Sequence, residues 1–356
     1  MRVLAWVPQE VDRSPGQRFR IEQWDPHLRR EGIEITYSPF APARLTTLLQ
    51  ESGELARKAW GLTRALGQRI RAAWKASEFD LVYVFREGAL LGPAIAERIL
   101  SRSGIPFVFD FDDAIWIRYV SPANSYLSYL RFPRKTATLC RLAAHVMAGN
   151  RYLADYASRY NARVSVIPTT IDTAKYQLLA PRTGPRPVIG WTGSYSTVQY
   201  LQLVGPALAR LRTRRDFKVV VVGGTGFSVD GVDVEHCPWR SATEAQDISC
   251  FDIGIMPLPD AEWERGKCGL KALQYMALGI PPVVSPVGIN REIVDHGRNG
   301  FLAATEDDWV DTLDLLLGDP ELRFRVGRAA RATVEERFSA MVQAPRVADV
   351  FRSTVS

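Results

Sequence analysis

The chain has 356 residues, 46% of them hydrophobic, which is the size of two domains and the composition of a water-soluble globular protein. Its net charge of +6 indicates acidic partners, such as nucleotides, phosphorylated lipids or an anionic membrane surface. The four cysteines form no CxxC pair, the four histidines are scattered, and no apolar run approaches about 18 residues, so we expect no zinc site, no Ser-His-Asp triad and no membrane-spanning helix.

Apolar strands alternate with helices along the first half of the chain. We predict strands at 2–8, 33–37, 80–85, 106–110, 145–148 and 164–167, and helices at 17–30, 57–75, 93–101, 131–143 and 152–159. This alternation predicts a parallel sheet covered by helices, with ligands bound beyond the carboxyl ends of the strands. The Pro/Gly/Arg-rich stretch 175–187, which has no periodicity, is the predicted linker to a second domain.

Polar residues follow the predicted strands of this first domain. The candidates for contacting a substrate are Gly16, Gln17, Arg18, Arg20 and Arg86. Their positions at the ends of strands favour a binding role, because ligands meet parallel sheets at that edge. The alternative is that Arg18 and Arg20 merely cover a surface.

Three carboxylates, Asp110, Asp112 and Asp113, lie just past another predicted strand. Like charges disfavour one another, so such a cluster indicates a function. It could bind a divalent metal as a DxD site, orient an acceptor hydroxyl, or cap the next helix. A metal is the weaker interpretation, because no further Asp, Glu or His lies close in sequence to complete the ligand shell.

The predicted helix at 57–75 is unusual because it combines tryptophans with basic residues. Trp60, Leu66, Ile70 and Trp74 recur near helical spacing, with arginines and lysines between them. A helix of this kind suits peripheral contact with an anionic membrane. In the alternative, the tryptophans pack on the protein's own sheet and the basic face is solvated.

The second half repeats the alternation. We predict strands at 188–191, 218–222, 232–236, 251–257 and 283–285, and helices at 200–213, 269–278, 307–317, 320–338 and 342–353. The fold class is therefore α/β, with two facing Rossmann-like domains and a cleft between them. We place the domains at 1–174 and 186–338, and expect the helix at 339–356 to return to the first domain.

The stretch 265–300 is the strongest candidate for a binding site. Lys267 and Lys271 are four positions apart and are expected on one face of a helix start, where free N–H groups favour an anion. The turn 288–290 precedes a second helix start, and two such starts would hold a diphosphate without a metal. Trp239 could stack on a flat base or pack in the core. The alternative for the whole stretch is an ordinary buried strand-helix unit with its lysines in water.

The segment GLKALQYMALGIPPVVSPVGINREIVDHGRNGFL resembles the corresponding part of glycosyltransferase family 4, which has the GT-B fold. The tail LGDPELRFRVGRAARATVEERFS is similar to the family's closing helices, and VIPTTID to its interdomain junction. The resemblance implies a retaining transferase that moves a sugar from a nucleotide donor to an acceptor held by the N-terminal domain. It implies no metal and no cofactor other than the donor substrate.

The chain departs from the family pattern at its Glu-x7-Glu motif. The second glutamate falls on Gln274 and the first on Gly266, and the nearest acid, Glu264, is out of register. The family's phosphate-binding Arg and Lys are also missing after the first strand of the second domain, so we expect Lys267 and Lys271 to supply that charge. The candidate donor-binding residues are Thr192, Gly193, Ser194, Trp239, Cys268, Gly269, Leu270, Gln274, Gly288, Ile289 and Asn290.

The predicted catalytic residues are Lys267 and Lys271 at the leaving diphosphate, with Asp112 or Asp113 facing the acceptor. The acceptor is a glycan, a lipid-linked molecule or a small molecule. Two alternatives remain: a nucleotide-sugar epimerase of the same fold, and a non-catalytic nucleotide-sugar-binding subunit. A nucleic-acid partner is not expected, because the basic residues form no aromatic-interleaved groove motif. The cysteines are typical of reduced thiols and no signal-peptide pattern is present, so we expect a cytoplasmic protein.

Overall fold

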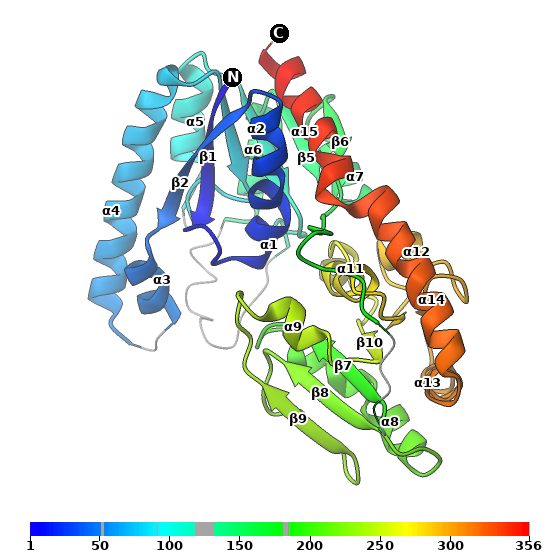
Figure 1. Ribbon diagram of the computed structural model, residues 1–356. Coiled ribbons are helices and arrows are strands. Elements are labelled where there is room, and N and C mark those ends of the chain that lie inside the picture. The colour runs from blue at the N-terminus through cyan, green and yellow to red at the C-terminus, as the bar shows by residue number, and fades with distance from the viewer. Residues whose placement is uncertain (51–52, 91, 118–131, 181–183, 185, 356) are drawn as a thin grey trace. The chain divides into compact units, whose positions relative to one another are not determined.

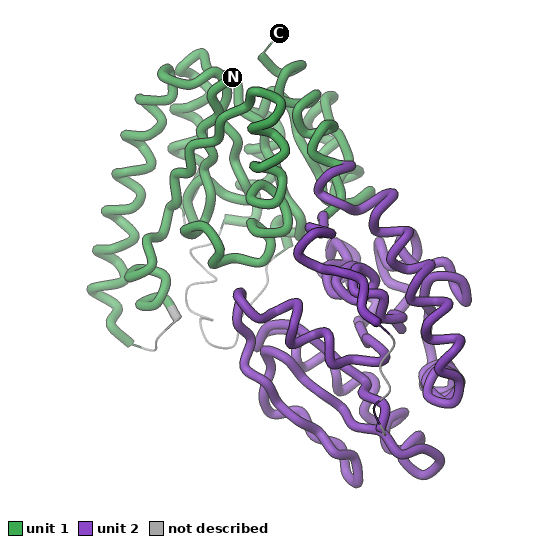
Figure 2. The backbone as a smooth tube through the Cα atoms, in the orientation of Figure 1, with its two compact units in different colours: residues 1–169, 343–356 green, residues 170–342 purple. Residues whose placement is uncertain are grey.

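The computed structural model of the chain describes residues 1–50, 53–90, 92–117, 132–180, 184 and 186–355. The chain forms two compact units, coloured separately in Figure 2. Unit 1 comprises Met1–Thr169 and Gln343–Ser356, and unit 2 comprises Thr170–Val342. The end of the chain therefore belongs to the same unit as its beginning.

Unit 1 contains a six-stranded parallel sheet in the order β2-β1-β3-β4-β5-β6 (Figure 1). The strands are β1 (Arg2–Gln9), β2 (Glu34–Ala41), β3 (Leu81–Phe85), β4 (Phe107–Phe111), β5 (His145–Ala148) and β6 (Val164–Val166). Every residue of β3 and β4 is buried, as expected for central strands that are covered on both faces. The strand order reverses between β1 and β3, so the sheet's switch point lies there.

The helices of unit 1 surround this sheet. They are α1 (Pro15–Gln17), η1 (Arg18–Glu22), α2 (Gln23–Arg30), α3 (Ala43–Gln50), α4 (Leu55–Trp74), η2 (Lys75–Glu78), α5 (Ile95–Arg102), α6 (Arg134–Leu142), α7 (Arg151–Ala157) and most of α15 (Ala340–Val355). In α15, Phe351 packs edge-on against Tyr83 at 5.9 Å, and Arg346 donates to the carbonyl of Val166 at 3.0 Å. These contacts attach the C-terminal helix to the first sheet.

Unit 2 repeats the architecture with the order β12-β11-β10-β7-β8-β9, all parallel. The strands are β7 (Val188–Thr192), β8 (Lys218–Val222), β9 (Asp233–Cys237), β10 (Ile253–Met256), β11 (Pro282–Val284) and β12 (Phe301–Leu302). The helices are η4 (Val198–Leu203), α8 (Gly205–Arg212), α9 (Glu244–Ile248), α10 (Glu262–Arg265), α11 (Leu270–Ala277), α12 (Asn290–Ile293), α13 (Glu306–Gly318), α14 (Pro320–Thr333) and η5 (Val334–Phe338). Its switch point lies between β7 and β10.

The predicted α/β fold with two parallel sheets is confirmed, but two predicted helices are broken. The helix expected at 17–30 is interrupted at Arg20, whose φ of −129° and ψ of −110° are not helical. The helix expected at 200–213 is two elements, because Pro206 at the start of α8 begins a new helix. The short elements α9, α10 and β12 were not predicted, because two to five residues carry too little periodicity. The helix α3 was also not predicted, because it precedes the stronger signal of α4.

Candidate functional site

The starts of α11 and α12 lie side by side in unit 2. Gly269 caps α11 with a φ of +69°, and a Cβ there would lie 2.3 Å from Ile293 Cδ1, 3.3 Å from Ile289 Cγ2 and 3.5 Å from Asn290 Oδ1. Glycine is therefore required both by the left-handed backbone and by the contact with α12. Two helix N-termini at one place make a favourable position for an anion.

Lys267 and Lys271 do not share one helical face, so that prediction is wrong. The left-handed Gly269 delays the start of α11 until Leu270, and Lys267 lies in the preceding loop. The Nζ of Lys267 lies 5.7 Å from the ring of Trp263, whereas that of Lys271 lies 5.4 Å from the ring of Trp191. Both lysines are only partly buried.

The turn after β7 runs directly beneath Lys271. A Cβ on Gly193 would lie 2.7 Å from Lys271 Cε and 2.4 Å from Trp191 Cη2, so only glycine allows this approach. Thr192 is 2% exposed and its N–H donates to Tyr275 Oη at 3.0 Å, so this predicted donor is already engaged within the protein. Ser194 is exposed at the same turn.

The turn before α12 is held by backbone and amide contacts. Gly288 has a φ of +53°, and a Cβ there would lie 2.6 Å from the carbonyl oxygen of Arg265. Asn290 donates from Nδ2 to the carbonyl of Ser285 at 3.0 Å. These contacts connect the turn 288–290 to the loop that carries Cys268, which is itself buried. The predicted residues of 265–290 are thus brought together at one edge of the sheet.

Two buried acids that sequence reasoning did not assign lie in this region. Glu264, at the end of α10, accepts a hydrogen bond from the hydroxyl of Tyr200 and is 7% exposed. Glu244, at the start of α9, accepts from Trp239 Nε1 and from Tyr176 Oη, each at 2.9 Å. Unit 2 therefore contains buried carboxylates even though Gly266 and Gln274 occupy the family's glutamate positions.

The structure corrects one expectation for Trp239, that it could pack in the core, and one for Tyr176, that it lies in a linker. Trp239 is only partly buried, so the core-packing alternative is wrong. Tyr176 falls in the stretch expected to be a linker, yet it is fully buried, and Arg331 donates to its carbonyl oxygen and to that of Thr173. The start of the predicted linker is therefore an ordered part of unit 2.

In unit 1, Arg86 joins the two carboxylates that follow β4. Its Nε lies 2.5 Å from Asp112 Oδ1 and its Nη2 lies 2.7 Å from Asp113 Oδ2. Arg86 has a φ of +56°, a strained conformation for a non-glycine residue that is typical of functional sites. A Cβ on Gly16 would lie 2.7 Å from Asp112 Oδ2, so α1, which follows β1, passes directly over this group. The four residues meet at the switch point of the sheet.

The predicted acceptor contacts through Arg20, Gln17 and Arg18 are not supported, because all three side chains are buried. Arg20, at 0% exposed, donates to both carboxylate oxygens of Asp110, and this prediction is wrong. Gln17 donates to Glu22 at 2.6 Å. Arg18 pairs with Asp12, with 2.8 Å between its Nε and Oδ1.

The aspartate cluster is divided by its partners, since Asp110 pairs with Arg20 whereas Asp112 and Asp113 pair with Arg86. Within the described part of the chain, no group of three or more His, Cys, Asp or Glu side chains is arranged to hold a metal ion.

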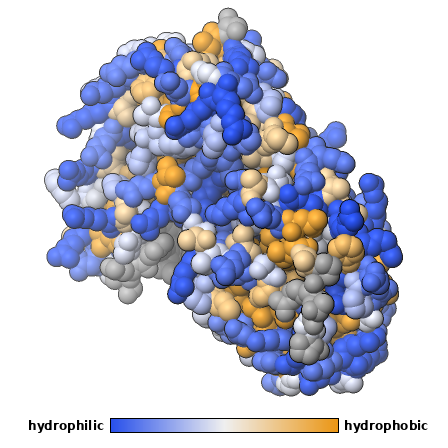
Figure 3. Space-filling model, viewed as in Figure 1, coloured by the Kyte–Doolittle hydropathy of each residue, from blue (hydrophilic) through white to orange (hydrophobic). Residues whose placement is uncertain are grey.

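The tryptophans of α4 face outward, so the alternative in which they pack on the sheet is wrong. Trp60 is 72% exposed and Trp74 is 68% exposed. The buried residues of this helix are instead Lys58, Ala65, Arg69 and Ala73. Hydrophilic residues predominate on the molecular face drawn in Figure 3. None of the helices in the described ranges is long and apolar enough to cross a bilayer.

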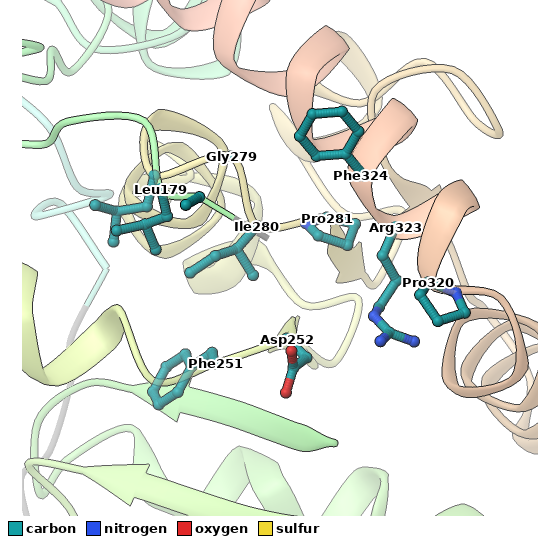
Figure 4. Close-up of a pocket in the computed structure, with 11 residues that line it drawn as sticks. Leu179, Phe251, Asp252, Gly279, Ile280, Pro281, Pro320, Arg323 and Phe324 are labelled. Atoms are coloured by element: carbon teal, nitrogen blue, oxygen red, sulfur yellow. The ribbon is translucent and has the colours of Figure 1, made fainter. Parts of the chain in front are cut away.

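A small pocket of about 70 Å³ lies elsewhere in unit 2 (Figure 4). Its lining includes Phe251 and Asp252, which precede β10, and Ile280 and Pro281, which precede β11. It is therefore at the amino ends of these strands, on the opposite edge from Gly193 and Lys271. Ligands of such sheets bind at the carboxyl edge, so we do not assign the pocket to the site.

Two family sequence models match the chain. Residues 22–175 match "Glycosyltransferase Family 4" and residues 186–319 match "Glycosyl transferases group 1". A D-inositol 3-phosphate glycosyltransferase of Arthrobacter is 29% identical over 209 residues, which cover 50% of this chain and 48% of the relative. An N-acetyl-alpha-D-glucosaminyl L-malate synthase of Bacillus anthracis is 36% identical over 156 residues, covering 41% and 40%. The chain spans about half the length of the curated relatives it matches.

The fold is that of Anabaena HepE, whose structure was solved in complex with UDP-glucose. The TM-score is 0.69 at 18% sequence identity, covering 99% of this chain and 100% of HepE. The strand orders of the two parallel sheets and the two matched family models point to the same fold and family. The chain belongs to glycosyltransferase family 4 and has the GT-B fold.

Proposed function

We propose that the chain transfers a sugar from a nucleotide-sugar donor to an acceptor hydroxyl, with retention at the sugar carbon and without a metal ion. The observation that carries the proposal is the convergence of the α11 and α12 starts with Lys271 over Gly193. When the bond between the sugar carbon and the diphosphate breaks, negative charge grows on the leaving phosphate. Fixed N–H groups and an ammonium group aimed there stabilise the transition state.

In this proposal, unit 1 binds the acceptor. Arg86, Asp112 and Asp113 meet at the switch point of that sheet, where ligands of such sheets bind. One of the aspartates orients the acceptor hydroxyl, whose oxygen forms the new bond to the sugar carbon as the bond to the diphosphate breaks, and the proton of the hydroxyl passes to the leaving phosphate. A glycan, a lipid-linked molecule and a small molecule all present such a hydroxyl.

The experiment is a thermal-shift panel of nucleoside diphosphates and nucleotide sugars, because a ligand that binds the folded state raises the melting temperature. UDP is the first compound to test, since a structure with the same fold holds UDP-glucose. Transfer is then measured with a labelled donor and candidate acceptors. A panel in which no nucleotide raises the melting temperature contradicts the proposal.

The same experiment separates the alternatives. A transferase releases labelled sugar from the donor only when an acceptor is present, whereas a nucleotide-sugar epimerase alters the donor alone. A non-catalytic binding subunit binds the donor without consuming it under any condition. The buried ordered site around Gly269 supports donor binding in all three cases, and the family supports transfer.

We further propose that the protein works in the cytoplasm and that residues 57–75 contact a membrane surface. Trp60, Gly67 and Trp74 are spaced seven residues apart, which is almost two full helical turns. They therefore form a stripe along one side of the helix that turns by only about 20° from one of these residues to the next. The arginines at 57, 64 and 71 form a parallel stripe about 60° away, and α4 contains no acidic residue. Exposed tryptophans beside basic residues suit the headgroup region of an anionic bilayer.

A further inference from the structure

Four side chains of unit 2 form one chain of hydrogen bonds that ends at Gln274 on α11. Trp239 Nε1 donates to Glu244 Oε1, Tyr176 Oη donates to Glu244 Oε2, and Gln274 Nε2 donates to Tyr176 Oη. Each of the three distances is 2.9 Å. Glu244, Tyr176 and Gln274 are 3%, 0% and 2% exposed, so water cannot readily replace a missing partner.

The carboxylate of Glu244 sets the direction of every bond in this chain. An ionised carboxylate only accepts, so Trp239 and Tyr176 must donate to it. Tyr176 has a single phenolic proton, and once that proton points at Glu244 its oxygen can only accept from Gln274. Gln274 therefore presents Nε2 to Tyr176 and turns Oε1 the other way. No described residue donates a hydrogen bond to that Oε1.

We infer that Glu244 is a positioning residue for the nucleotide: acting through Tyr176, it holds Gln274 with Oε1 as the acceptor for a hydroxyl of the bound nucleotide. The inference rests on the proposed function. Gln274 lies three residues beyond Lys271 on α11, which is a rise of about 4.5 Å along the helix axis. In a nucleoside diphosphate, the ribose with its hydroxyl groups is joined directly to the phosphates.

This arrangement predicts that restoring the family's glutamate at position 274 is harmful on its own. In Gln274→Glu, two carboxylates flank one phenolic proton, so one of them lacks a hydrogen bond from Tyr176 and the like charges repel. In Glu244→Gln, two amide groups face Tyr176. Either Gln274 must then turn its NH₂ group toward the nucleotide, or the new glutamine must turn its NH₂ group toward the Trp239 indole, which only donates.

The exchange of both residues satisfies every bond again, with the direction reversed. In Glu244→Gln/Gln274→Glu, the new glutamine accepts from Trp239 and donates to Tyr176, and Tyr176 donates to the new glutamate. The second oxygen of that glutamate still faces away from Tyr176 as an acceptor. A role in orienting Gln274 thus predicts rescue by the double variant, whereas a requirement for Glu244 itself does not.

The test is the Kd of UDP, measured by calorimetry on the full chain for the wild type, both single variants and the double variant, at a temperature where all four are folded. We expect each single variant to bind about tenfold more weakly, equivalent to about 1.4 kcal/mol. The double variant should bind within about threefold of the wild type. Glu306→Gln, in the exposed pair with Arg210, is the matched control and should leave the Kd unchanged.

The outcomes separate this inference from the proposed function. If the wild type binds UDP and both single variants bind it equally well, or the double variant binds no better than the weaker single variant, the inference is overturned while the proposed function stands. If the wild type binds neither UDP nor any other nucleoside diphosphate, the proposed function fails and the inference fails with it. Melting temperatures, recorded for each variant, show whether a loss of affinity is a loss of fold.

Discussion

Arg20 and Asp110 form a fully buried, two-pronged ion pair at the carboxyl end of β4. The Nε of Arg20 lies 2.6 Å from Asp110 Oδ2, and its Nη2 lies 2.5 Å from Oδ1. Tyr83 donates a further hydrogen bond to the same carboxylate, and Arg20 Nη1 donates to the carbonyl of Ile167 at 2.8 Å. Burial works to lower the pKa of Arg20, but the attraction of Asp110 raises it above its ordinary value. The pair connects η1, β4 and the end of β6.

Asp110→Asn should destabilise unit 1 by about 3–5 kcal/mol, because it leaves the Arg20 cation buried without a counter-charge. Arg20→Lys should also destabilise the unit, since lysine cannot form the two-pronged contact. The melting temperature measures both effects. Arg29→Lys, in the solvent-exposed pair with Asp25, is the control and should change stability by less than about 1 kcal/mol. Equal losses in Asp110→Asn and in the control would contradict the structural role.

Lys271→Ala and Lys267→Ala should each reduce turnover at least about tenfold, because each removes a charge from the proposed leaving-group site. Lys271 should matter more, since its side chain lies over Gly193 between β7 and α11. Turnover of labelled donor measures the effect, and Lys218→Ala, at the exposed pair with Glu235, provides the control. Rates close to the wild type in both site variants would remove these lysines from the mechanism.

Asp112→Asn and Asp113→Asn test the acceptor side. If one of them orients the acceptor hydroxyl, that variant should lower kcat by about tenfold or more while the Kd of UDP stays unchanged, because the proposed donor contacts are in unit 2. Transfer assays with and without EDTA, combined with calorimetry, make the comparison. Unchanged transfer in both variants and in EDTA would make this segment structural.

The fold was predictable because its signals are local. The buried runs of β3 and β10 are short, continuous and apolar, and each is followed by a helix. The close approach of the α11 and α12 starts was also foreseeable, since the glycines at 269 and 288 stand directly before them. The one error there was the shared helical face of the two lysines, because the sequence does not reveal that Gly269 is left-handed.

The parts of the site that were missed depend on contacts between distant residues. Tyr176 lies 98 positions from Gln274 and 68 from Glu244, in a stretch whose composition resembles a linker. Tyr200 lies 64 positions from Glu264. No spacing rule joins such residues. Similarly, the burial of Arg20 follows from Asp110, which is 90 positions away.

The stability of unit 1 should fall on mild acidification because of His145. Burial, with a smaller effect from Arg163, lowers the pKa of His145 below its ordinary value. Between the ordinary pKa of about 6.5 and the lower folded value, the unfolded chain binds more protons than the folded one, so stability is lost as the pH falls through this window. His145→Asn should reduce the difference in melting temperature between pH 7.5 and pH 5.5. A variant whose melting curve depends on pH as steeply as the wild type's would contradict this role.

Removing the basic and aromatic stripes of α4 should abolish membrane binding. Each basic residue near an anionic surface contributes about 1 kcal/mol, so the triple variant Arg57→Ala/Arg64→Ala/Arg71→Ala should lower vesicle partitioning on the order of 100-fold. Flotation with phosphatidylglycerol-containing vesicles, against phosphatidylcholine vesicles, measures it. Binding should weaken with salt, because exposed charges are screened.

The double variant Trp60→Ala/Trp74→Ala should weaken binding at every salt concentration, since it removes apolar contact rather than charge. A triple alanine variant at Arg210, Arg212 and Arg298 in unit 2 is the control, and equal flotation with neutral and anionic vesicles would contradict the proposal.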